Sequence, residues 1–164
     1  MFDQYTMRAR QVVMAARLKA GQRGAGAIET DDLLAALVIE DQGDFPKMMF
    51  ELRGHPISAI RVDPQSHSPF LDPALASSLL ARIEALLPRS QPVPTAQDMP
   101  LSEGVKHAFE AAAALKDELK QTRVGPLHLL AAAVGDEISQ GARIFREAGI
   151  TPGSVLQGIR EESG

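Results

Sequence analysis

Cysteine and tryptophan are absent from the 164 residues, and aromatic residues make up only 4% of the chain. The lack of cysteine excludes a disulfide framework and a thiolate zinc site. The first residues, "MFDQYTMRAR", have neither the basic nor the apolar region of a signal peptide, and no run approaches the roughly 18 apolar residues of a membrane span. We therefore expect a cytoplasmic protein with no membrane partner.

Positive charge is also scarce, because 17 Lys and Arg residues stand against 21 Asp and Glu residues. The net charge of −4 argues against a general nucleic-acid binder, which needs a basic surface. Apolar residues nevertheless make up 45% of the chain, which is enough for a packed core. Since Leu and Ala dominate among them, the composition favours helices.

Recognisable catalytic motifs are missing as well. The run "GQRGAG", residues 21–26, lacks the Gly-Lys-Ser/Thr end of a phosphate-binding loop and follows a predicted helix, so we interpret it as a flexible turn. No Gly-x-Ser-x-Gly elbow occurs, and no two of the 4 histidines have the i, i+4 spacing of a helical metal site. We expect no ATPase activity, no cofactor, no metal and no catalytic residue. A small enzyme built around Asp31 and His128 is the remote alternative.

The sequence does contain a long internal repeat. The stretch "IETDDLLAAL", residues 28–37, returns 96 positions later as "VGPLHLLAAA", residues 124–133. The same offset separates two helix caps, Thr6 and Ser102, and the apolar faces that follow them with helical spacing. In a third helix the offset falls to 95, with a glycine stop in each copy. The pattern predicts an all-α fold of two tandem four-helix repeats that pack with pseudo-two-fold symmetry.

One segment has no copy. The stretch "DPALASSLLARIEALLP", residues 72–88, has amphipathic periodicity and lies between two polar connectors that contain proline, so it predicts an extra central helix over 73–87. The fourth helices of the repeats are expected to begin near Pro56 and Pro152. The predicted organisation is one compact domain with a first repeat at 1–61, a linker with the extra helix at 62–98 and a second repeat at 99–164.

The repeat resembles the double Clp repeat, which is the N-terminal domain of the Clp-type AAA+ unfoldases. That family opens on a phenylalanine and an aromatic-Thr pair, matched here by Phe2 and Tyr5-Thr6, and shows Gly-Thr-Glu-His-Leu-Leu at the second helix of each repeat. The segment "PLSEGVKHAFEAA" resembles the usual start of the second repeat. The matching signature residues are Thr30, Leu33 and Leu34 in the first copy and Gly125, His128, Leu129 and Leu130 in the second.

The resemblance implies a mobile module ahead of an ATPase ring in chaperone and proteolysis machinery. Such a module docks adaptor proteins or substrate polypeptides, and we expect it to be a monomer in isolation. In some members the signature acid of each repeat holds phosphorylated arginine; Asp31 has that position in the first repeat and Leu127 in the second. Thr30, Asp31 and Asp32 are therefore the expected partner-binding residues. A free-standing regulator that docks on a Clp ATPase ring is the alternative.

Overall fold

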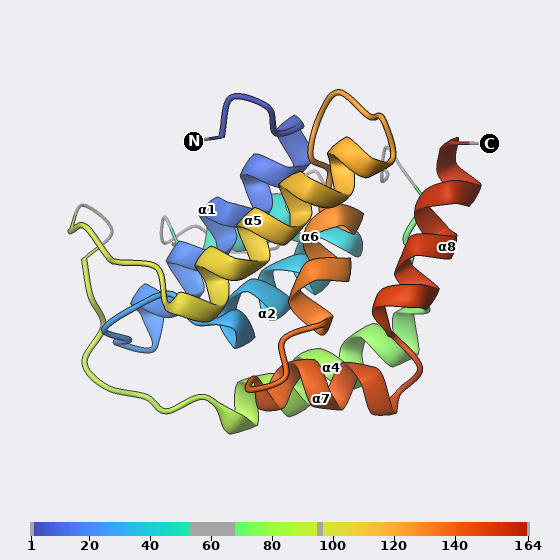
Figure 1. The fold of residues 1–164 in the computed structure, drawn as a ribbon. Helices are drawn as coiled ribbons and strands as arrows, with labels where there is room; N and C mark the ends of the chain where they lie inside the picture. Colours follow the sequence, from blue (N-terminus) through green and yellow to red (C-terminus); the bar gives the residue numbers. More distant parts are fainter. Residues whose placement is uncertain (1, 53–67, 95–96, 164) are drawn as a thin grey trace.

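The computed structural model describes residues 2–52, 68–94 and 97–163. Within these ranges the chain forms helices and no extended strand, so the all-α prediction is confirmed (Figure 1). The helices are α1 (Met7–Gln22), α2 (Thr30–Asp41), α3 (Phe45–Leu52), α4 (Pro73–Leu86), α5 (Glu103–Glu118), α6 (Pro126–Val134), α7 (Gln140–Glu147) and α8 (Pro152–Ser163).

Helices of the two halves correspond at the predicted offsets. Both α1 and α5 have 16 residues and begin 96 positions apart, while α3 and α7 have 8 residues each and begin 95 apart. The predicted caps are present: Thr6 Oγ1 accepts from Ala9 N–H at 3.0 Å, and Ser102 Oγ accepts from Val105 N–H at 3.2 Å. The helix expected near Pro56 and the boundary after residue 61 lie outside the described residues.

The halves are joined by two short parallel bridges, which pair Tyr5 with Val124 and Ile28 with Leu101. Leu101 is the repeat equivalent of Tyr5, and Ile28 is the repeat equivalent of Val124, each at the offset of 96 residues. Each half therefore offers the same two segments to the other. The four backbone hydrogen bonds are Thr6 N–H to Val124 O at 2.9 Å, Val124 N–H to Gln4 O at 2.7 Å, Ile28 N–H to Pro100 O at 2.9 Å and Ser102 N–H to Ile28 O at 3.0 Å. This reciprocity is the contact pattern of an approximate two-fold axis.

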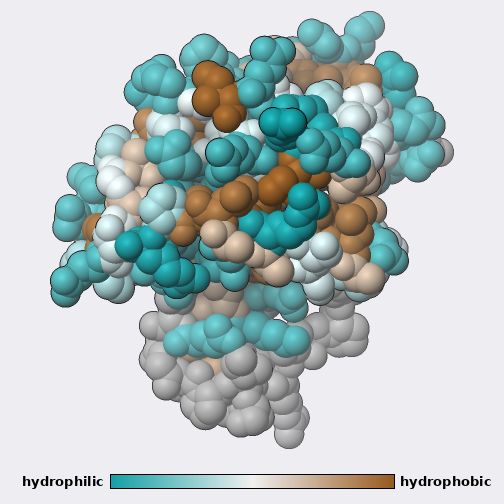
Figure 2. All heavy atoms as spheres, turned by 90° about the horizontal axis from the view of Figure 1, so that it is seen from below, coloured by the Kyte–Doolittle hydropathy of each residue, from teal (hydrophilic) through white to brown (hydrophobic). Residues whose placement is uncertain are grey.

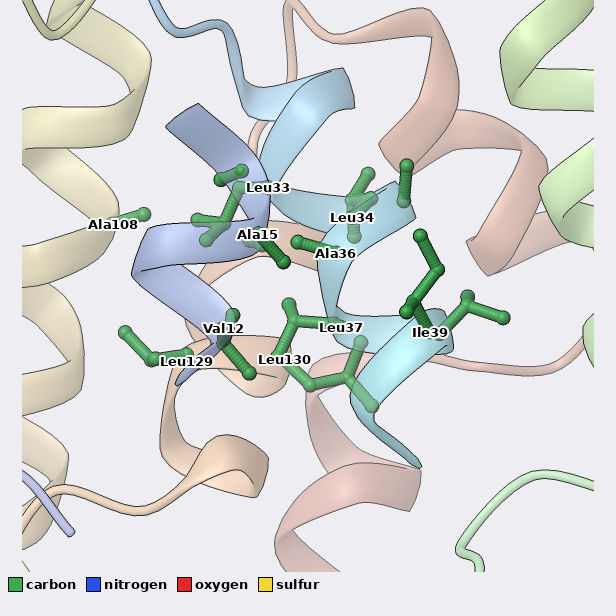
Figure 3. Close-up of a cluster of buried hydrophobic side chains, with 14 of the residues drawn as sticks. Val12, Ala15, Leu33, Leu34, Ala36, Leu37, Ile39, Ala108, Leu129 and Leu130 are labelled. Atoms are coloured by element: carbon green, nitrogen blue, oxygen red, sulfur yellow. The ribbon is translucent and has the colours of Figure 1, made fainter. Parts of the chain in front are cut away.

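The core forms around α2. This helix packs against α1, α4, α5, α6 and α7, and all its residues from Asp32 to Asp41 are buried. A helix that is apolar on nearly every side is stable only when others surround it. Figure 3 shows leucines of α2 in one cluster with side chains of α1 and α6, and this cluster includes Leu34 and its repeat equivalent Leu130.

The predicted extra helix is α4, which covers nearly the whole predicted span. The Asp72 carboxylate caps it by accepting from Ala74 N–H at 3.1 Å and Leu75 N–H at 3.2 Å. Helix α4 packs against α2 and α7, and its buried residues include Leu79 and Ile83 (Figure 1). Figure 2 shows the face on which α4 and α7 lie, where hydrophilic side chains surround a hydrophobic band.

The chain after α4 packs against the glycine-rich turn that follows α1. Ser90 N–H donates to Arg23 O at 2.6 Å, and Val93 N–H donates to Gly21 O at 2.8 Å. Gly24 has φ = +72°, and a Cβ built there would lie 2.3 Å from Gln91 O. The run interpreted as a flexible turn is therefore a packed one, because its glycines leave room for a second backbone.

We expect Leu34→Ala and Leu130→Ala each to lower the free energy of unfolding by about 2–5 kcal/mol, the cost of removing most of a buried leucine side chain. Both residues are buried, at 0% and 4% exposure. Urea denaturation measures the loss. Met14→Ala is the control, because Met14 is 50% exposed and should change stability by about 0.5 kcal/mol or less. Equal losses for all three variants would contradict the described core.

Gly24→Ala should lower the free energy of unfolding by at least about 1 kcal/mol, because alanine is strained at positive φ and its methyl group would meet the backbone of the following connector. Gly26→Ala is a matched control two residues away, since a Cβ there has no atom within 4 Å. The same urea denaturation compares the two variants. A stability loss at Gly26 equal to that at Gly24 would contradict the specific packing of the connector.

Candidate functional site

Two of the expected partner-binding residues lie at the N-terminus of α2, where the first half meets the second. Thr30 Oγ1 donates a hydrogen bond to Asp136 Oδ2 at 2.7 Å. Asp31 Oδ1 accepts from the Ser139 hydroxyl and from Gly141 N–H, the latter at 3.0 Å. Both side chains thus reach across to the loop between α6 and α7 and to the start of α7. The structure adds the hydrogen-bond partners of Thr30 and Asp31, and a binding role for the two residues stays a prediction.

Asp32 is in a different position, with no exposed surface. Arg23 Nε and Nη2 donate to its two carboxylate oxygens, each at 2.8 Å. Glu29 N–H also donates to Asp32 Oδ2 at 2.9 Å, which satisfies a free donor at the start of α2. The hydrogen bond with Asp32 raises the pKa of Arg23. These contacts fit a residue that positions the helix, and a binding role for Asp32 stays a prediction.

A cleft of about 440 Å³ opens beside Thr30 and Asp31. Its walls are the N-terminal ends of α2 and α5, the loop between α6 and α7, and the residues around the end of α4. The charged side chains that line it are Arg23, Glu29, Asp31 and Asp136. Because Arg23 already forms an ion pair with Asp32, the three acids determine the charge of the cleft, and it suits a cationic group.

Asp136 is held in its ionised form. Burial alone would raise the pKa of this carboxyl, but hydrogen bonds from the Thr30 hydroxyl and from the N–H groups of Ile138 and Ser139, with the positive charge of Arg146, together lower it. The two N–H groups lie 2.9 and 3.1 Å from Oδ1. The carboxylate therefore fixes the loop between α6 and α7 at the edge of the cleft and adds negative charge there.

The equivalent place in the second half is closed. Pro126 and Leu127 occupy the positions of Thr30 and Asp31. A crevice of only about 10 Å³ is left there, bordered by Leu37 and Leu71 among others. Among the described residues, Leu127 thus puts an apolar side chain at this junction, where the first half has the acid Asp31.

The remaining signature residues lie in the core or at the start of α6. Leu33, Leu34, Leu129 and Leu130 are all buried in the core. His128 Nδ1 accepts from Gly125 N–H at 2.8 Å, as Asp32 does from Glu29 in the first half. Since Nδ1 accepts, Nε2 carries the proton and faces Gln121 Oε1. Burial, and next the positive charge of Lys116, lower the pKa of His128 and keep the ring neutral.

Three residues of this region were not predicted from the sequence. They are Arg23, which pairs with Asp32, and Asp136 and Ser139, which bind Thr30 and Asp31. Ser139 carried a signal, because its hydroxyl caps α7 by accepting from Ala142 N–H at 3.0 Å and serine before a helix is a common cap. Arg23 carried none, since Leu119 stands at the 96-residue offset. Asp136 has an acidic counterpart at that offset in Glu40, but this did not indicate a contact with Thr30.

Comparison with known proteins identifies the fold. Residues 100–164 match the family model of the Clp repeat (R) N-terminal domain. The matched range begins two residues before the cap Ser102. Among solved structures, the N-terminal domain of the chaperone ClpD from Arabidopsis thaliana superposes with a TM-score of 0.66 at 15% identity, covering 98% of this chain and 97% of that one. The Hsp104 N-terminal domain from Candida albicans gives 0.64 at 18%, covering 99% and 93%. The second half of the chain thus matches the Clp repeat family, and the whole chain has the fold of Clp-type N-terminal domains.

A third structure, from work on a malarial protein secretion system, has the same fold as this chain. Its TM-score is 0.69 at 18% identity, covering 97% of this chain and 94% of that one. No curated protein sequence matches the chain. Within the described ranges of the N domain, no three His, Cys, Asp or Glu side chains gather as metal ligands would, and none of the helices there combines the length and the apolar character of a bilayer span.

The stability of the N domain should fall between pH 7.5 and pH 5.5 because of His128. Its pKa is lowered on folding, so the unfolded chain binds this proton more readily, and the stabilisation present above about pH 6.5 is lost as the pH falls. His128→Asn keeps an acceptor for Gly125 N–H but cannot titrate. The unmodified chain should therefore lose more stability than the variant over this range. Urea denaturation at each pH tests this, and parallel losses would contradict it.

Proposed function

We propose that this Clp-type N domain is a non-catalytic protein-binding module of a Clp chaperone or protease system, which docks adaptor proteins or substrate polypeptides in the cytoplasm. The observation that carries the proposal is the acidic cleft of about 440 Å³ at the junction of the two halves. Its polar groups are fixed by hydrogen bonds between the halves, as in a preformed binding site, and it has the size of an ordinary ligand pocket.

The chemistry of the cleft favours a basic side chain of the partner. Asp31 uses Oδ1 for Ser139 and Gly141, which leaves Oδ2 for a ligand. Glu29 is exposed beside it, and Asp136 is held ionised. A guanidinium group that enters the cleft would meet these acids and lose little of its hydrogen bonding to water, because carboxylates accept its fork of donors.

The two halves should differ in binding. A ligand at the equivalent place in the second half would meet Pro126, which has no side-chain donor, and Leu127, which has no charge. We propose one site per chain for any arginine-bearing or phosphoarginine-bearing segment. Asp31 has a shorter side chain than the glutamate at this position in the family that the chain resembles. The site should therefore bind such a segment with lower affinity than a site with glutamate.

Asp31→Asn should weaken binding of an arginine-containing peptide by about fivefold or more, because the carboxylate charge is lost while Oδ1 can still accept from Ser139 and Gly141. Backbone amide shifts during titration with a 12-residue peptide, unmodified and phosphorylated on arginine, measure affinity and location. The control is Asp117→Asn, which removes the same charge. Asp117 is exposed near the C-terminal end of α5, whereas the cleft borders the N-terminal end of that helix. This variant should leave binding unchanged.

The location of the shifts decides the number of sites. Saturable shifts are expected at residues 28–32 with one equivalent of peptide. Shifts of the same size at residues 125–128 would show a working second site and would contradict the one-site proposal. Equal weakening by Asp31→Asn and Asp117→Asn would mean that only overall charge matters and that the cleft is not the binding site.

A further inference from the structure

A second concavity lies outside the acidic cleft, along the outward side of α5 and α6. These helices pack side by side in the second half (Figure 1), and the groove between them has a volume of about 640 Å³. Its floor consists of small residues, among them Ala108, Ala111, Ala132 and Gly135, and Pro152 at the start of α8 closes one side. A floor of alanine and glycine lets another backbone approach these helices closely, since few side-chain atoms stand in the way.

The equivalent place in the first half is filled. Arg8 stands at the position of Gly104, and Glu40 stands at the position of Asp136. Arg8 donates to both carboxylate oxygens of Glu40, at 2.8 and 2.9 Å, and this ion pair lies across the gap between α1 and α2. In the second half there is no side chain at Gly104 to do the same, and Asp136 is bonded to Thr30 instead. Among the described residues, this ion pair therefore occupies in the first half the place that stays open beside Gly104 in the second half.

Ile138 stands at the rim of the groove and is 94% exposed. It is the most exposed of the large apolar residues in the described ranges. Its own backbone N–H donates to Asp136 Oδ1 at 2.9 Å, which fixes the loop that presents the side chain. Ile138 is thus an exposed apolar side chain on a fixed loop beside the apolar floor of the groove, and the two together form a surface that a partner can cover.

The charge around the groove indicates what kind of molecule fits. Glu103, Asp136 and Glu137 line it, whereas His107 is its one basic side chain. Lys106 pairs with Glu103 at 3.3 Å but is not among the lining residues. An apolar floor with acidic edges complements a helix that has a narrow apolar stripe flanked by Lys or Arg.

We propose that the groove between α5 and α6 binds an amphipathic, basic helix of a partner polypeptide, and that Ile138 packs against the apolar stripe of that helix. This surface adjoins the acidic cleft, for which we propose a single basic side chain as the ligand. The two concavities share only Gly104, Asp136 and Ile138. The domain thus has two adjacent binding surfaces with different requirements, a charged group for one and an apolar helix face for the other.

A designed peptide of about 16 residues, with leucines at i, i+3, i+4 and i+7 and lysines on the flanks, is the probe. Fluorescence anisotropy with the full chain measures its dissociation constant. Ile138→Ser removes the rim contact, and Ala111→Gln adds bulk to the floor without changing charge. Each should weaken binding by about fivefold or more, and neither should change the melting temperature, because both residues are exposed. Met7→Ser is the control and should leave binding unchanged. Met7 is 76% exposed, stands in the first half at the position that corresponds to Glu103, and does not line the groove.

Two further peptides test the chemistry of the partner. A twin with glutamate in place of each lysine should bind about tenfold or more weakly, and a scrambled peptide of the same composition should bind weakly too. The proposal is overturned if Ile138→Ser and Ala111→Gln bind the lysine peptide as the unmodified chain does. It is also overturned if the scrambled peptide binds equally well. Asp31→Asn should leave the affinity for the lysine peptide within about twofold, which keeps this result separate from that of the acidic cleft.

Discussion

Everything in this domain depends on the reciprocal backbone bridges between its halves. The segment before α1 bonds to the segment before α6, and the segment before α2 bonds to the segment before α5. These four segments end in the residues that start the four central helices, so the bridges place all four helix N-termini at the junction of the halves. The positive ends of the helix dipoles and their free N–H groups are therefore gathered where the halves meet. Side chains that accept hydrogen bonds are needed there, which explains why Thr6, Ser102, Asp32 and His128 stand at these positions.

The backbone of the two halves is nearly the same, but the side chains make their surfaces different. Gly104 is central to this difference, because a Cβ there would lie 2.7 Å from both Asp136 Oδ2 and Thr30 Oγ1. A larger residue would break the contact that fixes Asp136 and would fill both concavities. The first half has Arg8 at that position and is closed by its ion pair with Glu40. A single glycine thus leaves space for two candidate binding surfaces that adjoin each other where the halves meet, while an arginine occupies the equivalent position in the first half.

The sequence predicted those features that repeat. Caps and apolar faces each occur twice, at an offset that changes once from 96 to 95, and two occurrences distinguish a signal from chance. Thr30 and Asp31 were found because their surroundings resemble a signature. The features that were missed occur once: the packing of the connector against Gly24, the ion pair of Arg23 with Asp32, and the partners Asp136 and Ser139. Each joins residues that are distant in sequence or of unlike type, and no periodicity or offset connects such residues before the chain is folded.

The choice of cap at the start of the second helix in each half accounts for the position of the acidic cleft. Asp32 and His128 both accept from the N–H three residues earlier, but Asp32 is a buried charge and needs a counter-ion, whereas neutral His128 needs only Gln121. Arg23 supplies that counter-ion and also donates to Pro88 O at 3.3 Å, just after α4. Leu86, Leu87 and Pro88 then form one wall of the cleft. A charged cap in the first half thereby fixes the residues around the end of α4 beside Thr30 and Asp31. The neutral cap in the second half requires no arginine and fixes no such wall.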